Sequence, residues 1–210
     1  MPIRVVLADD HVLVRQSLKS LLEREGFQVV AEASDGQEAL RQVKSLQPEI
    51  AVMDISMPIL NGIDAARELS NSTPQTKTIL LTQHDEEQYV SEALRAGLKG
   101  YVLKSQVASD LIHAIQRVSH GDVYLSPGVS ATLANSYQAG SDRASDPLTP
   151  RERQVLQLIA EGKSTKDVAS LLGISVKTAE SHRTRLMHKL DIHETASLVR
   201  YAVRRGIVEP

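Results

Sequence analysis

The sequence predicts an α/β protein, in which a doubly wound domain with a five-stranded parallel sheet is followed by a small all-α domain of four helices. In residues 3–120, short apolar runs of strand length alternate with segments whose apolar residues recur at helical spacing. In residues 147–210 only the helical spacing remains. The intervening residues, 121–146, are rich in Gly, Ser, Asp, Ala and Pro, which is typical of a linker.

Five strand–helix units account for the first domain. The expected strands are short apolar runs of the kind buried in parallel sheets, and they cover residues 3–8, 28–31, 50–53, 78–81 and 101–103. The expected helices carry apolar residues three or four positions apart, and they cover residues 12–22, 36–46, 62–69, 89–94 and 111–118. Gly26, Pro48 and Gly97 end three of these helices. Because βαβ crossovers are right-handed, the five units predict a doubly wound sheet.

Four helices account for the second domain. The first follows Thr149, where Thr-Pro-Arg-Glu forms a capping box with Pro at the first helical position. The second opens at Ser164, and the third is capped by Ser175. The fourth spans roughly residues 194–205 and carries enough apolar surface either to pack into the core or to form a dimer seam.

Residues 165–184 have the spacing of a helix-turn-helix motif. Gly173 permits the tight turn, and Ala169 is small where two helices cross. The inner faces of the motif and of the third helix are expected at the apolar positions Val168, Leu172, Ile174, Val176, Ala179, Leu186 and Leu190. Any small helical bundle uses Ala and Gly in these ways, so the motif taken alone leaves that alternative open.

Composition and charge restrict the class of protein. With no cysteine the chain has no disulfide and no thiolate metal site, and a cytoplasmic setting is expected. No apolar run approaches the roughly 20 residues of a membrane-spanning helix, and the N-terminus runs straight into a strand rather than a signal peptide. Residues 1–120 carry 12 Lys and Arg against 16 Asp and Glu, whereas residues 147–210 carry 11 against 7. The basic second half is therefore expected to meet a polyanion.

Polar residues of the kind that handle phosphate stand where four of the five strands end. Asp9 and Asp10 follow the first strand, Asp54 the third, Thr82 the fourth and Lys104 the fifth. Because ligands bind at the carboxyl ends of the strands in such sheets, these side chains are expected to converge on one spot if the strands are adjacent. Clustered carboxylates repel one another and demand a cation, and oxygen ligands suit Mg²⁺.

This set predicts the capture of a phosphoryl group on an aspartate. Asp54 ends the strand expected at the centre of the sheet and is the candidate nucleophile. Asp10, with Asp9 behind it, and the backbone carbonyl of Ser56 are the candidate Mg²⁺ ligands alongside Asp54. The lysine and threonine side chains named above would then bind the phosphoryl oxygens.

The same residues resemble a known family over nearly the whole chain. Asp9-Asp10, the run Asp54–Gly62, Thr82 and the run Gly100–Lys104 are similar to the receiver domain of bacterial response regulators, which has a flavodoxin-like fold. The second half resembles the LuxR-type output domain, so the whole chain resembles the NarL/FixJ subfamily. The resemblance implies a phosphoprotein rather than an enzyme, which receives its phosphoryl group from a sensor histidine kinase. It also implies a switch formed by Thr82 and Tyr101, and a homodimer on DNA with RNA polymerase as a further partner.

The third helix of the second domain is expected to lie in the major groove of DNA. The resemblance places base contacts mainly at Glu180, Ser181 and Thr184. The candidates for phosphate contacts, which position the protein without reading sequence, are Lys177, Thr178, Arg183, Arg185 and Lys189.

Other interpretations and two departures from the family pattern stay open. A Mg²⁺-dependent aspartyl phosphohydrolase would share the nucleophile, but such enzymes usually carry a second acid where this chain has Ser56. A constitutive DNA-binding regulator with a purely interacting front domain, and a LuxR-type sensor of a small molecule, are the other candidates. Ser105 stands where the family often has Pro, which leaves the isomer of the Lys104–Ser105 bond open. Gln83 and His84 follow Thr82 where a small residue is common, which leaves the phosphoryl lifetime open.

Overall fold

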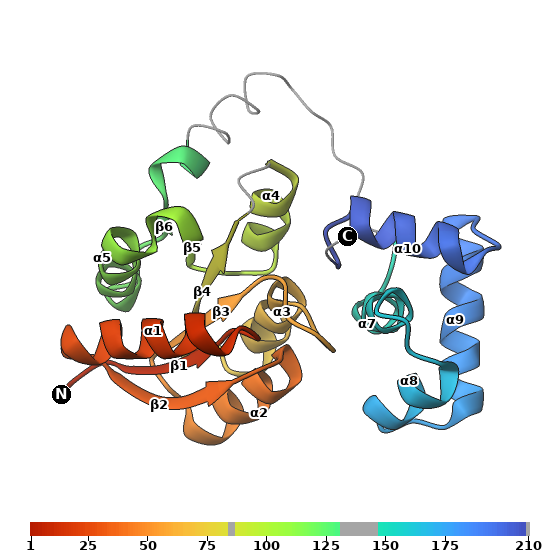
Figure 1. The fold of residues 1–210 in the computed structure, drawn as a ribbon, viewed down its shortest axis with the longest axis horizontal. Coiled ribbons are helices and arrows are strands. Elements are labelled where there is room, and N and C mark those ends of the chain that lie inside the picture. The colour runs from red at the N-terminus through yellow and green to blue at the C-terminus, as the bar shows by residue number, and fades with distance from the viewer. Residues whose placement is uncertain (84–86, 131–146, 209–210) are drawn as a thin grey trace. The chain divides into compact units, whose positions relative to one another are not determined.

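The computed structural model divides into two compact units, residues 1–141 and residues 142–210. It describes residues 1–83, 87–130 and 147–208 (Figure 1). His84 and most of the expected linker lie outside the described residues. In the part of the chain that is described, no helix has the length and the apolar character needed to cross a membrane.

The first unit contains a six-stranded, wholly parallel sheet in the order β2-β1-β3-β4-β5-β6. The strands are β1 Arg4–Ala8, β2 Gln28–Ala33, β3 Ile50–Asp54, β4 Lys77–Thr82, β5 Gly100–Leu103 and β6 Tyr124–Leu125. The predicted fold class and its five strands are confirmed. The order of the strands reverses between β1 and β3, which is the switch point at which doubly wound sheets bind their ligands.

The sixth strand was not expected, because Tyr124 and Leu125 stand at the start of the predicted linker. Ser126 directly follows this strand, is fully buried, and joins the segment to β5 by hydrogen bonds. The Ser126 N–H donates to the Tyr101 carbonyl at 2.9 Å. The Ser126 hydroxyl donates to Asp110 at 2.7 Å and accepts from the Leu103 N–H at 3.3 Å. The first residues of the predicted linker are therefore joined to the sheet.

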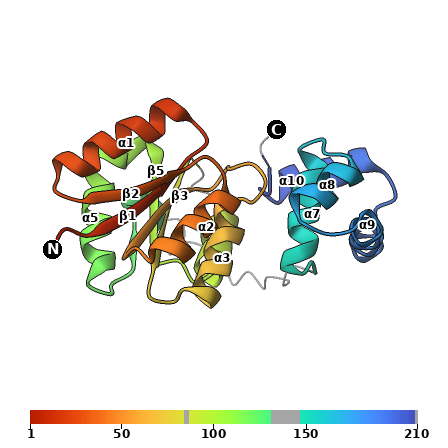
Figure 2. The same ribbon diagram turned by 90° about the horizontal axis from the view of Figure 1, so that it is seen from below.

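Helices cover both faces of the sheet (Figure 2). They are α1 Val12–Arg24, α2 Gly36–Leu46, α3 Gly62–Ser72, α4 Glu87–Arg95 and α5 Val107–Ser119, and a short 3₁₀ turn, Lys104–Gln106, precedes α5. Alternate strand residues point to opposite faces, so the apolar residues form two core clusters. One cluster includes residues of α1 and α5, and the other includes residues of α2, α3 and α4.

Two details of these helices differ from the expectation. Helix α3 continues through Ser72 instead of ending near Leu69, because its last turn is polar and carries no apolar signal. Thr73 closes that turn, since both its N–H and its hydroxyl donate to the Leu69 carbonyl. In α1, Leu18 and Leu22 are buried, whereas Val12 and Leu13 in the first turn are 59% and 83% exposed.

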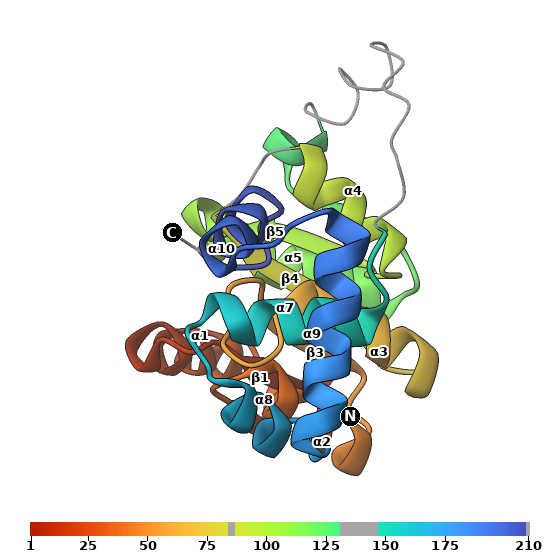
Figure 3. The ribbon, with the colours of Figure 1, turned by 90° about the vertical axis from the view of Figure 1, so that its right-hand side faces the viewer.

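The second unit consists of the four predicted helices, α7 Pro150–Ala160, α8 Thr165–Leu171, α9 Val176–Leu190 and α10 Thr195–Arg204. Capping boxes begin α7 at Thr149 and α8 at Ser164, and the Ser175 side chain caps α9. Gly173 has a φ of +62°, the left-handed conformation that lets α8 turn sharply into α9. Helix α9 packs against both α7 and α8 and crosses α7 (Figure 3).

Candidate functional site

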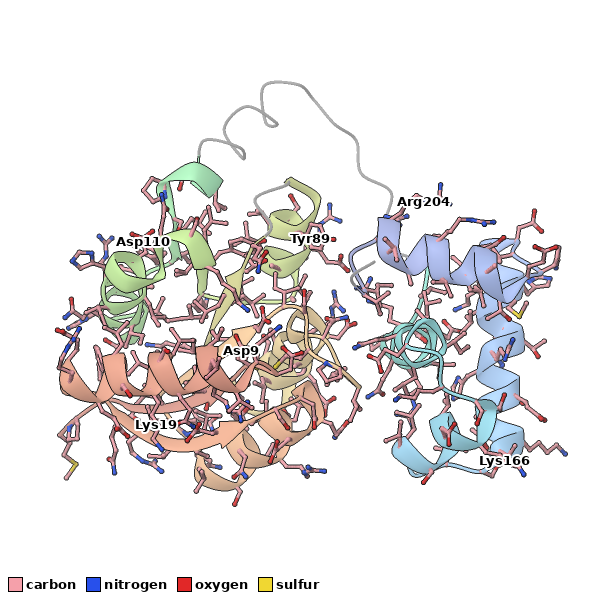
Figure 4. All side chains as sticks on the ribbon, viewed as in Figure 1. Asp9, Lys19, Tyr89, Asp110, Lys166 and Arg204 are labelled. Carbon is pink, nitrogen blue, oxygen red and sulfur yellow. The ribbon has the colours of Figure 1, made fainter. Side chains whose placement is uncertain are left out.

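The carboxyl ends of β1, β3, β4 and β5 bring the predicted phosphate-handling residues to one edge of the sheet. Asp9 directly follows β1, Asp54 ends β3, Thr82 ends β4 and Lys104 directly follows β5. The Lys104 Nζ lies 2.8 Å from Asp54 Oδ2 and 3.0 Å from Asp9 Oδ2. Figure 4 labels Asp9 at this edge, beyond the first turn of α1. One ammonium therefore bridges carboxylates from two neighbouring strands.

Burial and charge set the protonation of this cluster. Asp9 is fully buried and Asp54 is 3% exposed. Burial raises the pKa of Asp54, and the charge of Asp9 adds to that effect, while Lys104 and a hydrogen bond from the Ser56 backbone oppose it. Burial also disfavours the Lys104 ammonium, but the two carboxylates outweigh it and raise the pKa of Lys104. Asp10 adds a third carboxylate to this cluster, so the negative charges outnumber the single ammonium of Lys104 and leave an excess for a cation to balance.

The donor set fits a divalent cation. Asp9, Asp10, His11 and Asp54 each offer a ligand atom, and these four atoms lie within 4.8 Å of one another. Among the described residues, Asp10 Oδ1 is fully buried and has no hydrogen-bond partner. A buried carboxylate oxygen that makes no hydrogen bond and lies beside two further carboxylates is a ligand of the kind that an oxygen-ligated ion such as Mg²⁺ takes. His11 is the member of this set that the sequence analysis missed, although it directly follows the two aspartates.

Arg15 supports the acidic loop, which contains Asp9 and Asp10. Its Nη1 donates to the Asp9 backbone carbonyl at 2.6 Å, and its side chain is only 14% exposed. Glu32 on β2 lies 3.4 Å from the Arg15 Nε and 2.8 Å from the Lys19 Nζ. The hydrogen bond from Lys19 is the main cause that lowers the pKa of Glu32. Helix α1 and strand β2 thus fix the position of the loop that carries the two aspartates.

The loop that follows Asp54 is tightly constrained. The Leu60 N–H donates to the Pro58 carbonyl at 2.7 Å, which makes a three-residue turn centred on Ile59. Ile59 has a φ of +69°, a strained conformation for a β-branched residue. A Cβ on Gly62 would lie 2.1 Å from the Asp54 carbonyl oxygen, so only glycine fits at that position. The backbone around the candidate nucleophile is therefore fixed from both sides.

The two predicted switch residues lie inside the first unit. Thr82 is 1% exposed and Tyr101 is fully buried, on the adjacent strands β4 and β5. Tyr101 belongs to the core cluster that also includes Val129, so its ring already points inward. All peptide bonds among the described residues are trans, which answers the question left open for the Lys104–Ser105 bond.

Helix α9 presents a polar surface whose charged residues are mainly basic. Its exposed residues include the six expected to face outward, Lys177, Glu180, Ser181, Thr184, Arg185 and His188. The expectation that Val176 faces inward is wrong, because it is 40% exposed at the first position of α9, where helical periodicity extends beyond the packed part of the helix. Two of the proposed phosphate contacts are already engaged within the unit. The Lys189 Nζ lies 2.7 Å from Glu152 Oε2, and the Arg183 Nη2 donates to the Thr195 hydroxyl at 2.8 Å.

Comparison with known proteins identifies the family. The response regulator receiver domain matches residues 5–116, and the luxR family of bacterial regulatory proteins matches residues 146–202. The transcriptional regulatory protein MctR of Rhizobium johnstonii is 42% identical over 98% of this chain and 95% of its own length. The oxygen regulatory protein NreC of Staphylococcus carnosus is 38% identical over 98% of this chain and 99% of its own length.

A solved structure agrees with these matches. RcsB from Salmonella enterica serovar Typhimurium, bound to a promoter in the presence of the phosphomimetic BeF₃⁻, matches with a TM-score of 0.62 and 28% identity. The match covers 96% of this chain and 98% of that chain. The receiver fold and the helix-turn-helix domain described above thus occur together, in the same order, in a regulator solved on DNA. The chain belongs to the NarL/FixJ subfamily of two-component response regulators, which are DNA-binding transcription regulators rather than enzymes.

Proposed function

We propose that Asp54 accepts a phosphoryl group from a sensor histidine kinase, and that this modification controls DNA binding by α9. The observation that carries the proposal is the buried Asp54 carboxylate, 2.8 Å from the Lys104 Nζ, at the switch point of the sheet. The proposed receiver spans residues 3–120 and the proposed DNA-binding domain residues 147–210. Asp54 lies at the same edge of the sheet as Asp9, Asp10 and Lys104.

Each residue of the site has a proposed task in the transfer. An Asp54 oxygen forms a bond to phosphorus as the bond between phosphorus and the donor's imidazole nitrogen breaks, and the electron pair of that bond stays with the nitrogen. Mg²⁺, held by Asp9, Asp10, Asp54 and the Ser56 carbonyl, would neutralise charge on the phosphoryl oxygens. The Lys104 ammonium, now shared by two carboxylates, moves to a phosphoryl oxygen.

The switch follows from the same contacts. When Lys104 leaves Asp9 and Asp54 for the phosphoryl group, the end of β5 is drawn toward the site, and the Thr82 hydroxyl donates to another phosphoryl oxygen. Tyr101 lies on β5, the strand that ends directly before Lys104, and its burial supports an inward position in the switched state. The Ser126 hydrogen bonds to β5 would carry the change to the start of the linker.

The proposed partners are supported by two surfaces. For the kinase, the exposed Val12 and Leu13 form an apolar patch directly after the acidic loop, where a partner must bind to deliver a phosphoryl group. For DNA, the exposed residues of α9 supply base contacts at Glu180, Ser181 and Thr184. Phosphate contacts are proposed at Lys177, Thr178 and Arg185, whereas Lys189 is paired with Glu152. RcsB was solved as dimers on DNA, which supports a homodimer here, with RNA polymerase as the partner of a DNA-bound regulator.

Phosphoryl transfer is tested by intact mass. The full-length protein is incubated with acetyl phosphate and Mg²⁺, and one added phosphoryl group is expected. Asp54→Asn is expected to add none, while Asp122→Asn, which changes an exposed aspartate on a loop, is expected to behave as wild type. Equal phosphoryl uptake by Asp54→Asn and wild type would refute the assignment of the nucleophile.

A further inference from the structure

His11 stands at a position where helices usually carry a capping side chain, but it does not cap. It is the N-cap residue of α1, and its side chain makes no hydrogen bond to the N–H groups of the first turn. Ser, Thr, Asp or Asn at this position stabilises a helix by such a hydrogen bond, so α1 lacks this contribution. The imidazole instead lies against the two aspartates that precede it.

The contact between His11 and Asp10 is close but is not a hydrogen bond. The His11 Nδ1 lies 2.8 Å from Asp10 Oδ1 and 3.3 Å from Asp9 Oδ1. Asp10 Oδ1 nevertheless has no hydrogen-bond partner among the described residues, although it is fully buried. The His11 Nδ1 and the Asp10 Oδ1 therefore approach each other as closely as neighbouring ligands of a metal ion do.

The distances agree with that arrangement. Ligand atoms about 2.1 Å from an octahedral ion lie about 3.0 Å apart when adjacent and about 4.2 Å apart when opposite. The two distances from His11 Nδ1, 2.8 Å and 3.3 Å, lie on either side of the adjacent value. The full set of four ligand atoms, which includes one from Asp54, spans no more than 4.8 Å. Small movements of the side chains would therefore bring all four atoms to one ion.

We propose that His11 is a nitrogen ligand of the metal site, and that it makes this site prefer a divalent first-row transition-metal ion, such as Mn²⁺ or Ni²⁺, over Mg²⁺. This inference rests on the metal site of the proposed function. Mg²⁺ takes oxygen ligands and keeps several of its waters, so the imidazole adds little to its binding. Transition-metal ions gain from an imidazole nitrogen, and their affinities for a given site rise along the series from Mn²⁺ to Ni²⁺.

The test measures metal preference directly on the full-length protein. The dissociation constants for Mg²⁺ and Ni²⁺ are determined by calorimetry for wild type and for His11→Ala. The ratio of the Mg²⁺ constant to the Ni²⁺ constant is expected to fall by about tenfold or more in His11→Ala, since even partners that only orient metal ligands contribute that much. His113→Ala, which removes an exposed histidine of α5, is the matched control and is expected to leave the ratio unchanged.

A spectroscopic readout identifies the ligand itself. With Mn²⁺ bound, pulsed electron paramagnetic resonance of the wild type is expected to show modulation from an imidazole ¹⁴N, which His11→Ala abolishes. Absence of that modulation in wild type, or an equal loss of affinity for both ions in His11→Ala, would overturn the proposal and leave His11 as a residue that only orders the loop.

Failure of this inference is distinguishable from failure of the proposed function. If wild type takes up a phosphoryl group at Asp54 with Mg²⁺ while His11→Ala leaves the metal ratio unchanged, only the role of His11 is refuted. If wild type takes up no phosphoryl group, the proposed function itself fails.

Discussion

Lys189 and Lys177 lie on the same helix, α9, but the structure predicts opposite consequences of removing them. Both were assigned to DNA phosphates from the sequence. The Lys189 Nζ lies 2.7 Å from Glu152 Oε2, and the Glu152 side chain is only 5% exposed. Glu152 also accepts from the Thr149 N–H at 2.8 Å, which closes the capping box of α7. Lys177 is exposed in the first turn of α9.

The magnitude follows from the environment of the pair. A hydrogen bond between charged groups contributes about 1.5–3 kcal/mol. The Lys189 side chain is 36% exposed, which places this pair in the lower part of that range. Lys189→Met is therefore expected to lower the free energy of unfolding of the second unit by about 2 kcal/mol. Because about 1.4 kcal/mol corresponds to a factor of ten, amide protection in α7 and α9 should fall about 30-fold.

The assay combines hydrogen exchange with DNA binding on the full-length protein. Lys189→Met should show the loss of protection but keep the wild-type dependence of DNA affinity on salt. Lys177→Met should keep its protection but lower the slope of log affinity against log salt by about 0.9, the value for one lost phosphate contact. A reduced salt slope in Lys189→Met, with wild-type protection, would show that Lys189 contacts DNA and that its pair with Glu152 contributes little.

Three further predictions concern the switch, the electrostatics and the specificity. Lys104→Ala is expected to accept a phosphoryl group but to lose the coupling to DNA binding; wild-type DNA affinity of the phosphorylated variant would refute this. Burial raises the pKa of Asp54 above its ordinary 3.8, so the folded state holds this proton more tightly than the unfolded state. The free energy of unfolding therefore falls as the pH rises from 3.8 through the higher pKa of the folded state. Asp54→Asn should therefore gain stability over wild type as the pH rises above 3.8, and a constant difference in denaturation experiments would exclude this. Glu180→Ala should change the preferred bases in a binding-site selection at fixed salt, because one direct base contact contributes about 1–3 kcal/mol of discrimination between bases. Unchanged base preferences would show that Glu180 makes no base contact.

The strands and helices that carry local sequence signals were predictable from the sequence. The strands of the first unit stand out because apolar runs end abruptly in Asp9, Asp54 and Lys104, and the parallel order brings those ends together without further information. Three of the four helices of the second unit were equally clear, since Thr149, Ser164 and Ser175 mark their starts through local hydrogen bonds. Local signals of this kind need no knowledge of the tertiary structure.

The parts that depend on distant partners were not predictable. Strand β6 has two residues, too few for any periodicity, and it exists because Tyr101 and Lys99 supply the carbonyls for its segment. In the sequence, Lys189 cannot be distinguished from the other basic residues of α9 that are expected to contact DNA. Only the fold reveals its partner Glu152, which is 37 residues away. His11 has no distinguishing signal in the sequence, and only the fold shows that its ring lies against the two aspartates.

The central claim is that the state of Asp54 controls DNA binding by α9, and one measurement tests it most directly. Full-length wild type and Asp54→Asn are each used to select duplexes from a random DNA library at one fixed salt concentration, with and without BeF₃⁻ and Mg²⁺. The affinity of wild type for its selected site is expected to rise when BeF₃⁻ is present, and that of Asp54→Asn to stay the same. An unchanged wild-type affinity, or an equal rise in both proteins, would contradict the account.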